Sequence, residues 1–217
     1  MNEFDTRAEA KSNTPKGKFI VIEGCDFTGK STVIEKLVET LNIQGVESVQ
    51  SKALGETKYG RILRKFLIEN RQALTNEVQA FTMIDAMQEM NKNKLRFQQE
   101  DGVFVVCDRY YHSTLVYQGM RKNALEIVEE QLSEANLIEP DFTIILDCDT
   151  SVILERMKAR AETNSYDPKS AEEVEEIRNA YFQLSQRENT ALVDTTNLTV
   201  EGAVEMIMGL LQFLLKL

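Results

Sequence analysis

Apolar residues follow two alternating patterns along the chain: short continuous runs, and longer segments with helical spacing. The short runs are rich in β-branched residues and are typical of buried strands, which we expect at 18–23, 46–51, 103–107, 142–146 and 190–193. Helical spacing predicts helices at 31–42, 59–68, 77–98, 124–135, 151–161, 171–186 and 200–217. This alternation predicts an α/β fold with a parallel sheet between two layers of helices. Ligands then bind outside the carboxyl ends of the strands.

Two segments do not fit these patterns. Residues 1–17 are polar with no apolar core, so we expect a disordered tail and no secretory signal, ahead of a single domain at 18–217. The sequence ETNSYDPKS at 162–170 breaks the helical pattern, and it predicts a short mobile lid at about residues 160–170.

Composition narrows the possible functions. A formal net charge of −10 argues against a broad nucleic-acid surface, although it leaves room for a small anionic ligand bound by local cations. No stretch approaches the length of an apolar membrane span. Cys25, Cys107 and Cys148 lie in or beside apolar runs without metal-ligand spacing, so we expect buried thiols in a reducing cytosol.

Residues 24–31 read GCDFTGKS and match the phosphate-loop pattern G-x-x-x-x-G-K-[ST], between an expected strand and an expected helix. In such a loop the backbone N–H groups and the helix N-terminus attract phosphates. Lys30 would supply a point charge to the β- and γ-phosphates, and the Ser31 hydroxyl would reach Mg²⁺. The alternative is a glycine-rich turn without a ligand.

Two further groups of charges adjoin this loop. Asp108 and Arg109 follow the strand at 103–107, so Asp108 can orient a magnesium-bound water and Arg109 can clamp a phosphate. A surface ion pair is the alternative. Arg156 and Arg160 are four residues apart on one helical face beside the expected lid, where a solvated charged face is the alternative.

Three segments together resemble the thymidylate kinase family. FIVIEGCDFTGKST at 19–32 is similar to the family's E-G-x-D/E-x-x-G-K-[ST] segment. CDRYYHSTLVYQG at 107–119 is similar to its D-R-Y/H…Y-Q-G segment, and LDCDTSVILERMKARAE at 146–162 is similar to its helix and lid. Arg178 and Tyr181 stand where the family has R-x-x-Y. The resemblance implies a three-layer P-loop NTPase fold, ATP and Mg²⁺, and transfer of a phosphoryl group to a deoxynucleoside monophosphate, with dTMP preferred.

The resemblance also implies roles residue by residue. Catalysis would rest on Asp26, Lys30, Arg109, Arg156 and Arg160. ATP would be bound by Gly24, Asp26, Phe27, Thr28, Gly29, Lys30, Ser31, Thr32, Arg156 and Arg160. The acceptor would be bound by Asp26, Lys52, Phe81, Asp85, Arg109, Ser113, Tyr117 and Gln118, with Phe81 stacked on the base. The metal would be held by Ser31 and, through water, by Asp108.

The chain departs from the family pattern at several positions. Its phosphate loop has Phe27 and Thr28 but no arginine, so the catalytic arginine is expected from the lid. Lys52 replaces a phosphate-binding arginine and lacks its fork. Asp85 stands where the family reads the thymine carbonyl with an arginine. Either Asp85 turns away and water or Gln88 reads that carbonyl, or it reads an amino group on another base.

Alternatives to a dTMP kinase are a kinase for another or a modified deoxynucleotide, and a non-catalytic P-loop switch. A GTPase should carry an N/T-K-x-D motif, which this chain lacks, whereas residues 194–197 resemble the family's adenine-side loop. We expect His112 to have a packing or surface role, and Met83, Met87 and Met90 to lie in the core. The expected partners are small nucleotides and a second copy of the chain, in the cytoplasm, without nucleic acid or membrane.

Overall fold

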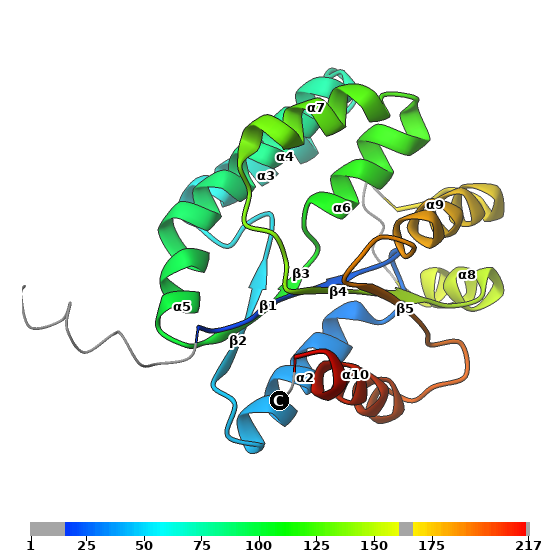
Figure 1. Cartoon of the computed structure of the whole chain (residues 1–217). Coiled ribbons are helices and arrows are strands. Elements are labelled where there is room, and N and C mark those ends of the chain that lie inside the picture. The colour runs from blue at the N-terminus through cyan, green and yellow to red at the C-terminus, as the bar shows by residue number, and fades with distance from the viewer. Residues whose placement is uncertain (1–15, 161–166, 216–217) are drawn as a thin grey trace, which may run out of the picture.

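A computed structural model describes residues 16–160 and 167–215, so most of the predicted tail and lid lies outside the described residues. Within the described residues, the strands form one parallel sheet in the order β2-β3-β1-β4-β5 (Figure 1). Each strand agrees with its predicted range to within two residues; they are β1 (Phe19–Glu23), β2 (Ser48–Lys52), β3 (Phe104–Asp108), β4 (Phe142–Asp147) and β5 (Thr190–Asp194).

The predicted helices are also confirmed. They are α2 (Lys30–Ile43), α3 (Lys58–Asn70), α4 (Asn76–Met90), α7 (Leu125–Ala135), α8 (Thr150–Ala159), α9 (Ala171–Leu184) and α10 (Val200–Leu215). The long helix predicted at 77–98 is α4 continued by a π-helical turn, η2 (Asn91–Leu95), and by α5 (Arg96–Glu100).

One helical segment was not predicted from the sequence. It follows β3 and consists of α6 (Tyr111–Thr114), the π-helical turn η3 (Leu115–Gly119) and the 3-10 turn η4 (Met120–Lys122). His112, Leu115 and Val116 are all buried here. Because the segment is short and buried on most sides, it has no polar stripe to reveal a helical period. The ring of His112 stacks on that of Tyr111 with centroids 4.1 Å apart, which confirms a packing role.

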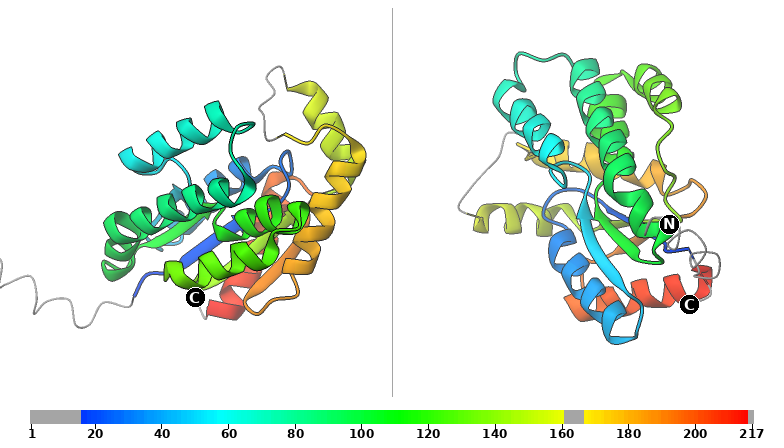
Figure 2. Two further views of the ribbon diagram at one scale, coloured as in Figure 1. Left: turned by 90° about the horizontal axis from the view of Figure 1, so that it is seen from above. Right: turned by 90° about the vertical axis from the view of Figure 1, so that its left-hand side faces the viewer.

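Each face of the sheet is covered by helices, which confirms the three-layer fold. On one face, Ile20 and Ile22 of β1 pack with α2 and α10. On the other face, Phe19 and Val21 pack with α3, α4 and η2, and the neighbouring strand β4 packs with η3, α7, α8 and α9. Figures 1 and 2 show α2 and α10 together on one side of the sheet and α3, α4, α6 and α7 on the other. Strand β1 is therefore buried from both sides.

Parallel pairing brings the carboxyl ends of the strands to one edge of the sheet. Ile22 of β1 is paired with Asp108 of β3, and Lys52 of β2 is paired with the same Asp108. The loop after β1, the end of β2 and the end of β3 therefore meet, which is where ligands bind in open α/β sheets.

The three cysteines are buried free thiols, as the sequence predicts. In the part of the chain that the structure describes, no helix is both long enough and apolar enough to cross a membrane.

Candidate active site

The predicted phosphate loop joins the end of β1 to the start of α2. Gly24 has φ of +134°, and a Cβ atom there would lie only 2.1 Å from the carbonyl oxygen of Leu146. Gly29 has φ of +91° directly before α2 begins. Residues other than glycine rarely adopt such angles, so both glycines are required by the backbone. The loop presents a helix N-terminus to solvent, and such termini favour anions.

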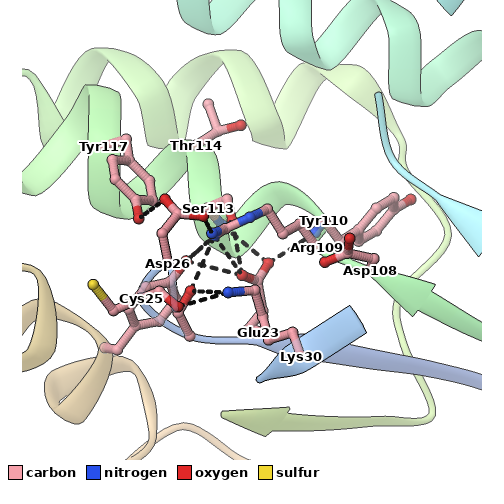
Figure 3. Close-up of polar contacts among 12 residues, drawn as sticks. Glu23, Cys25, Asp26, Lys30, Asp108, Arg109, Tyr110, Ser113, Thr114 and Tyr117 are labelled. Atoms are coloured by element: carbon pink, nitrogen blue, oxygen red, sulfur yellow. Dashed lines mark hydrogen bonds and ion pairs between the residues drawn. The ribbon is translucent and has the colours of Figure 1, made fainter. Parts of the chain in front are cut away.

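Lys30 is folded back against this loop. Its Nζ atom donates to the carbonyl oxygens of Cys25 at 2.6 Å and Gly24 at 3.1 Å (Figure 3). Burial, with the positive charge of Arg109 adding to it, lowers the pKa of Lys30 to about 8. Among the residues that the structure describes, the ammonium group is therefore held only by backbone oxygens, and it is available for an anion that reaches the loop.

Arg109 joins β3 to the phosphate loop. Its backbone has a φ of 65°, unusual for a residue with a side chain. The guanidinium donates through Nη2 to Asp26 Oδ1 at 2.7 Å, and through Nη1 to the Gly24 carbonyl at 3.1 Å. The same Nη1 contacts the hydroxyls of Ser113 and Tyr181, each at 3.0 Å. These contacts hold the arginine at one place beside the loop (Figure 3).

Glu23, the last residue of β1, is fully buried beneath Arg109. Its Oε1 accepts from the backbone N–H groups of Tyr110 at 2.8 Å and Ser113 at 3.2 Å. Its Oε2 accepts from the hydroxyls of Ser113 at 2.7 Å and Tyr181 at 2.9 Å. Burial raises the pKa of Glu23, with Arg109 and the hydrogen bonds opposing the rise. The carboxyl group thus orients two hydroxyls that contact Arg109.

Asp26 lies between Arg109 and Tyr117. Tyr117 donates its hydroxyl to Asp26 Oδ2 at 3.4 Å, while Oδ1 accepts from Arg109. Burial by itself raises the pKa of this carboxyl, but the charges of Arg109 and Lys30 outweigh it and hold the pKa below its ordinary value. Asp26 is therefore an ionised acceptor at the floor of the site.

Lys52 and Asp108 form an ion pair where β2 and β3 end, with Nζ 3.1 Å from Oδ2. The other oxygen, Oδ1 of Asp108, is buried and has no hydrogen-bond partner among the described residues. A magnesium-bound water suits such an oxygen, and Ser31 adds a hydroxyl on the same cavity, so these residues fit Mg²⁺, which prefers oxygen ligands. The described residues contain no group of three His, Cys, Asp or Glu for a metal. The ion would therefore need phosphate oxygens as further ligands.

These residues surround one cavity of about 510 Å³, a size typical of ligand sites. Its walls carry five cations and two carboxylates: Lys30, Lys52, Arg64, Arg109, Arg160, Asp26 and Asp108. Positive charge is therefore concentrated here, although the chain as a whole carries −10. Such a cavity attracts phosphates. The structure also brings to this cavity several further residues that the sequence analysis named: Phe27, Gly29, Thr32, Ser113, Tyr117 and Gln118.

The uncharged wall of the cavity comes mainly from α3 and α4. It is formed by Leu54, Leu67, Ile68, Met83 and Met87. Gln118 of η3 also faces the cavity; it is 3% exposed, and its Oε1 has no hydrogen-bond partner within the described part of the chain. The wall suits a flat apolar ring, and Gln118 is the polar group that can read its edge.

Phe81 and Asp85 do not line this cavity. Phe81 is 64% exposed, and the Asp85 carboxylate accepts a hydrogen bond from the hydroxyl of Tyr59 on α3. Helix α4 instead turns Met83 and Met87 toward the cavity. Residues two apart on a helix do not share a face, so with Met83 and Met87 on the cavity wall, Phe81 and Asp85 point elsewhere.

The two lid arginines lie at the end of α8. Arg156 donates through Nη1 to the Phe27 carbonyl at 3.0 Å. The guanidinium carbon of Arg160 lies 5.7 Å from the centroid of the Phe27 ring, and Arg160 lines the cavity.

Thr28 is buried and donates to the Cys25 carbonyl at 3.0 Å, so it shapes the phosphate loop from within.

Arg178 and Tyr181 serve different parts of the molecule. Arg178 forms a two-pronged contact with Asp147 at the end of β4, Nε to Oδ1 at 2.8 Å and Nη2 to Oδ2 at 2.9 Å. Tyr181 reaches one turn further to Arg109 and Glu23.

Sequence reasoning did not single out several residues that the structure brings to the site. Glu23 stands in the matched segment at 19–32 but was given no role, although a carboxylate that closes a buried apolar run is itself a signal. Arg64, Leu54 and Thr114 were given no role either. Arg64 lies on α3, Leu54 after β2 and Thr114 at the end of α6, and they meet at the cavity only through tertiary packing.

A three-layer parallel fold with a phosphate loop on its central strand, and with further cations around the same cavity, is that of a P-loop nucleotide kinase. Comparison of the chain with known protein families narrows this class to one family. The family model described as "Thymidylate kinase" matches residues 22–207. The chain therefore belongs to the thymidylate kinase family.

Individual proteins agree with this placement. The chain is 31% identical to the thymidylate kinase of Caldicellulosiruptor saccharolyticus over 203 residues, which cover 93% of this chain and 98% of the relative. It is 29% identical to a probable thymidylate kinase of Pyrococcus abyssi, over 91% of this chain and 97% of that protein. Its fold is similar to the solved thymidylate kinase of Candida albicans, with a TM-score of 0.73, 20% identity, and coverage of 91% and 92%.

Proposed function

We propose that this chain is a dTMP kinase, which transfers the γ-phosphoryl group of ATP to dTMP and releases ADP and dTDP. One observation carries the proposal beyond family membership. Arg109, the cation proposed to bind the acceptor phosphate, is hydrogen-bonded to Gly24 and Asp26 of the phosphate loop. Donor and acceptor phosphates would therefore be held against a single rigid network, as in-line transfer between them requires.

In this proposal the donor phosphates bind the loop from Gly24 to Thr32, with Lys30 as their point charge. Ser31, and Asp108 through water, would hold Mg²⁺, and the ion would neutralise charge on the phosphates. Arg109, Lys52 and Arg64 hold the acceptor phosphate, and Arg160 faces the transferred group. No residue forms a covalent intermediate, since catalysis here is positioning and charge stabilisation.

The base would lie against the uncharged wall formed by Leu54, Met83 and Met87. The amide of Gln118 offers both an acceptor and a donor, so it matches the N3–H and O4 of thymine together. Its unpartnered Oε1 supports this role. Tyr117, Ser113 and Asp26 would line the sugar side. Phe81 and Asp85 have no part in this arrangement.

We further propose a homodimer formed through α3 and α4. Tyr59, Ile62 and Phe66 on α3, and Val78 and Phe81 on α4, are large apolar side chains that are at least two-fifths exposed. The contact of Tyr59 with Asp85 joins the two helices, and we infer that these side chains form one apolar face. Such a face marks a protein interface, and a second copy of the chain is the occupant that the family resemblance suggests. The buried free thiols support a reducing, cytoplasmic location.

The decisive experiment is a coupled ADP-release assay with ATP, Mg²⁺ and a panel of dTMP, dUMP, dCMP, dGMP and dAMP. We expect the highest kcat/KM for dTMP, and no turnover when Mg²⁺ is removed with a chelator. Lys30→Ala should remove activity while circular dichroism stays unchanged. A higher kcat/KM for another base would assign a different acceptor. Nucleotide binding without any turnover would favour a P-loop switch.

A further inference from the structure

Phe27 occupies a strained position in the phosphate loop. Its φ is 69°, in the left-handed region that bulky side chains rarely adopt. Strain of this kind persists only where the surroundings hold it, and it is concentrated at functional sites. The Phe27 ring is half-buried against the cluster that contains Cys25, Ile153 and Ile177, and it also lines the cavity.

Both arginines at the end of α8 contact this one residue. Arg156 donates a hydrogen bond from Nη1 to the Phe27 carbonyl oxygen at 3.0 Å. The guanidinium of Arg160 lies over the Phe27 ring, 5.7 Å from its centroid. The backbone and the side chain of Phe27 therefore both hold α8 against the loop. These two contacts in turn help to keep Phe27 in its strained conformation.

Within the described ranges 16–160 and 167–215, the ring contact leaves the charge of Arg160 without a carboxylate partner. No carboxylate forms an ion pair with Arg160 among the residues that the structure describes. An aromatic face attracts a guanidinium through its quadrupole and does not neutralise it. A salt bridge would hold the side chain equally well, but it would compete with phosphate for the same N–H groups.

We propose that Phe27 is a positioning residue, whose ring holds the Arg160 guanidinium at the rim of the cavity while its carbonyl anchors Arg156. An arginine that is ordered before ATP arrives loses less freedom when it meets the transferred phosphoryl group. This inference rests on the proposed function and extends it from the catalytic cation to the residue that places it.

The test compares Phe27→Leu with Phe27→Tyr. Leucine keeps apolar bulk and the same backbone demand but removes the aromatic face, whereas tyrosine keeps the face. With ATP and dTMP, we expect Phe27→Leu to lower kcat about two- to fivefold, the range for a partly exposed cation–π contact, with KM for dTMP unchanged. Phe27→Tyr should restore most of kcat. Phe182→Leu, which removes a 57% exposed ring on α9, is the matched control and should keep the parent kcat.

A double-mutant cycle with Arg160→Met separates positioning from a structural role. If the ring acts through Arg160, Phe27→Leu should have no further effect on kcat once Arg160 is replaced. An equal loss in both backgrounds, an unchanged kcat in Phe27→Leu, or an equal loss in Phe27→Tyr would overturn the proposal. Unfolding midpoints and active-site titration on each variant normalise kcat to folded enzyme. A parent chain that fails to phosphorylate any monophosphate would refute the proposed function instead, before the variants are compared.

Discussion

The protonation state of Lys30 changes within the pH range in which the enzyme can be assayed. Burial lowers its pKa to about 8, so the free enzyme holds the ammonium form below that pH and loses it above. We predict that kcat/KM for ATP is constant at pH values below the pKa of Lys30 and falls as the pH rises through about 8. Bound phosphates favour the charged form, so the fall in kcat should lie at higher pH. A kcat/KM that stays level up to the ordinary pKa of lysine would contradict this, provided that thermal unfolding shows intact enzyme throughout.

The hydroxyl of Tyr181 links the buried carboxylate of Glu23 to Arg109. Tyr181→Phe removes one hydrogen bond to each group and leaves the ring packed. We predict a rise in KM for dTMP, because Arg109 is less firmly placed, and a loss of about 1–3 kcal/mol in the free energy of unfolding. Steady-state kinetics and urea unfolding measure the two effects.

Tyr111→Phe is the control for this prediction, since its hydroxyl donates to the exposed Glu139 at 2.8 Å and lies outside the cavity lining. It should keep the parent KM. Equal KM values for Tyr181→Phe and the parent would show that Arg109 is placed without this hydroxyl.

Helix α4 is the element whose orientation decides which residues line the uncharged wall of the cavity. It faces the cavity with Met83 and Met87 and presents Asp85 to Tyr59 on α3. We predict that Asp85→Ala leaves the ratio of kcat/KM between dTMP and dCMP within about twofold, since an exposed polar contact is worth little. Gln118→Leu should lower kcat/KM for dTMP about tenfold or more, through lost hydrogen bonds to the base. A shift in the ratio for Asp85→Ala as large as that for Gln118→Leu would place Asp85 at the base after all.

The whole molecule presents an apolar face on α3 and α4 that a monomer would leave in water. We predict that light scattering coupled to gel filtration gives twice the chain mass of 24.8 kDa for the parent. A Phe66→Glu and Phe81→Glu double variant should give the single-chain mass, because two charges would have to be buried in the interface. Phe213→Glu, on the 83% exposed side chain of α10, is the control and should remain a dimer. A parent of single-chain mass would refute the homodimer.

Much of this molecule follows from local patterns in its sequence. The five strands and most helices could be predicted, because alternating buried runs and amphipathic segments each leave a periodic trace. The phosphate loop could be predicted as well, since Gly24, Gly29, Lys30 and Ser31 act through backbone geometry that depends only on neighbouring residues. Membership of the family follows from the same contiguous segments.

The tertiary structure decided which side chains meet. A match of motifs along the chain does not determine the rotation of α4, because that rotation depends on how Met83, Met87 and Met90 fill the space above β1 and β3. The segment at 111–122 is helical only because it is buried on most sides, so it shows no polar stripe. Glu23 at the end of β1, Arg109 directly after β3 and Tyr181 on α9 come together, although Glu23 and Tyr181 are 158 residues apart in the chain. Contacts over such separations arise from packing the whole sheet, and no local period in the sequence can encode them.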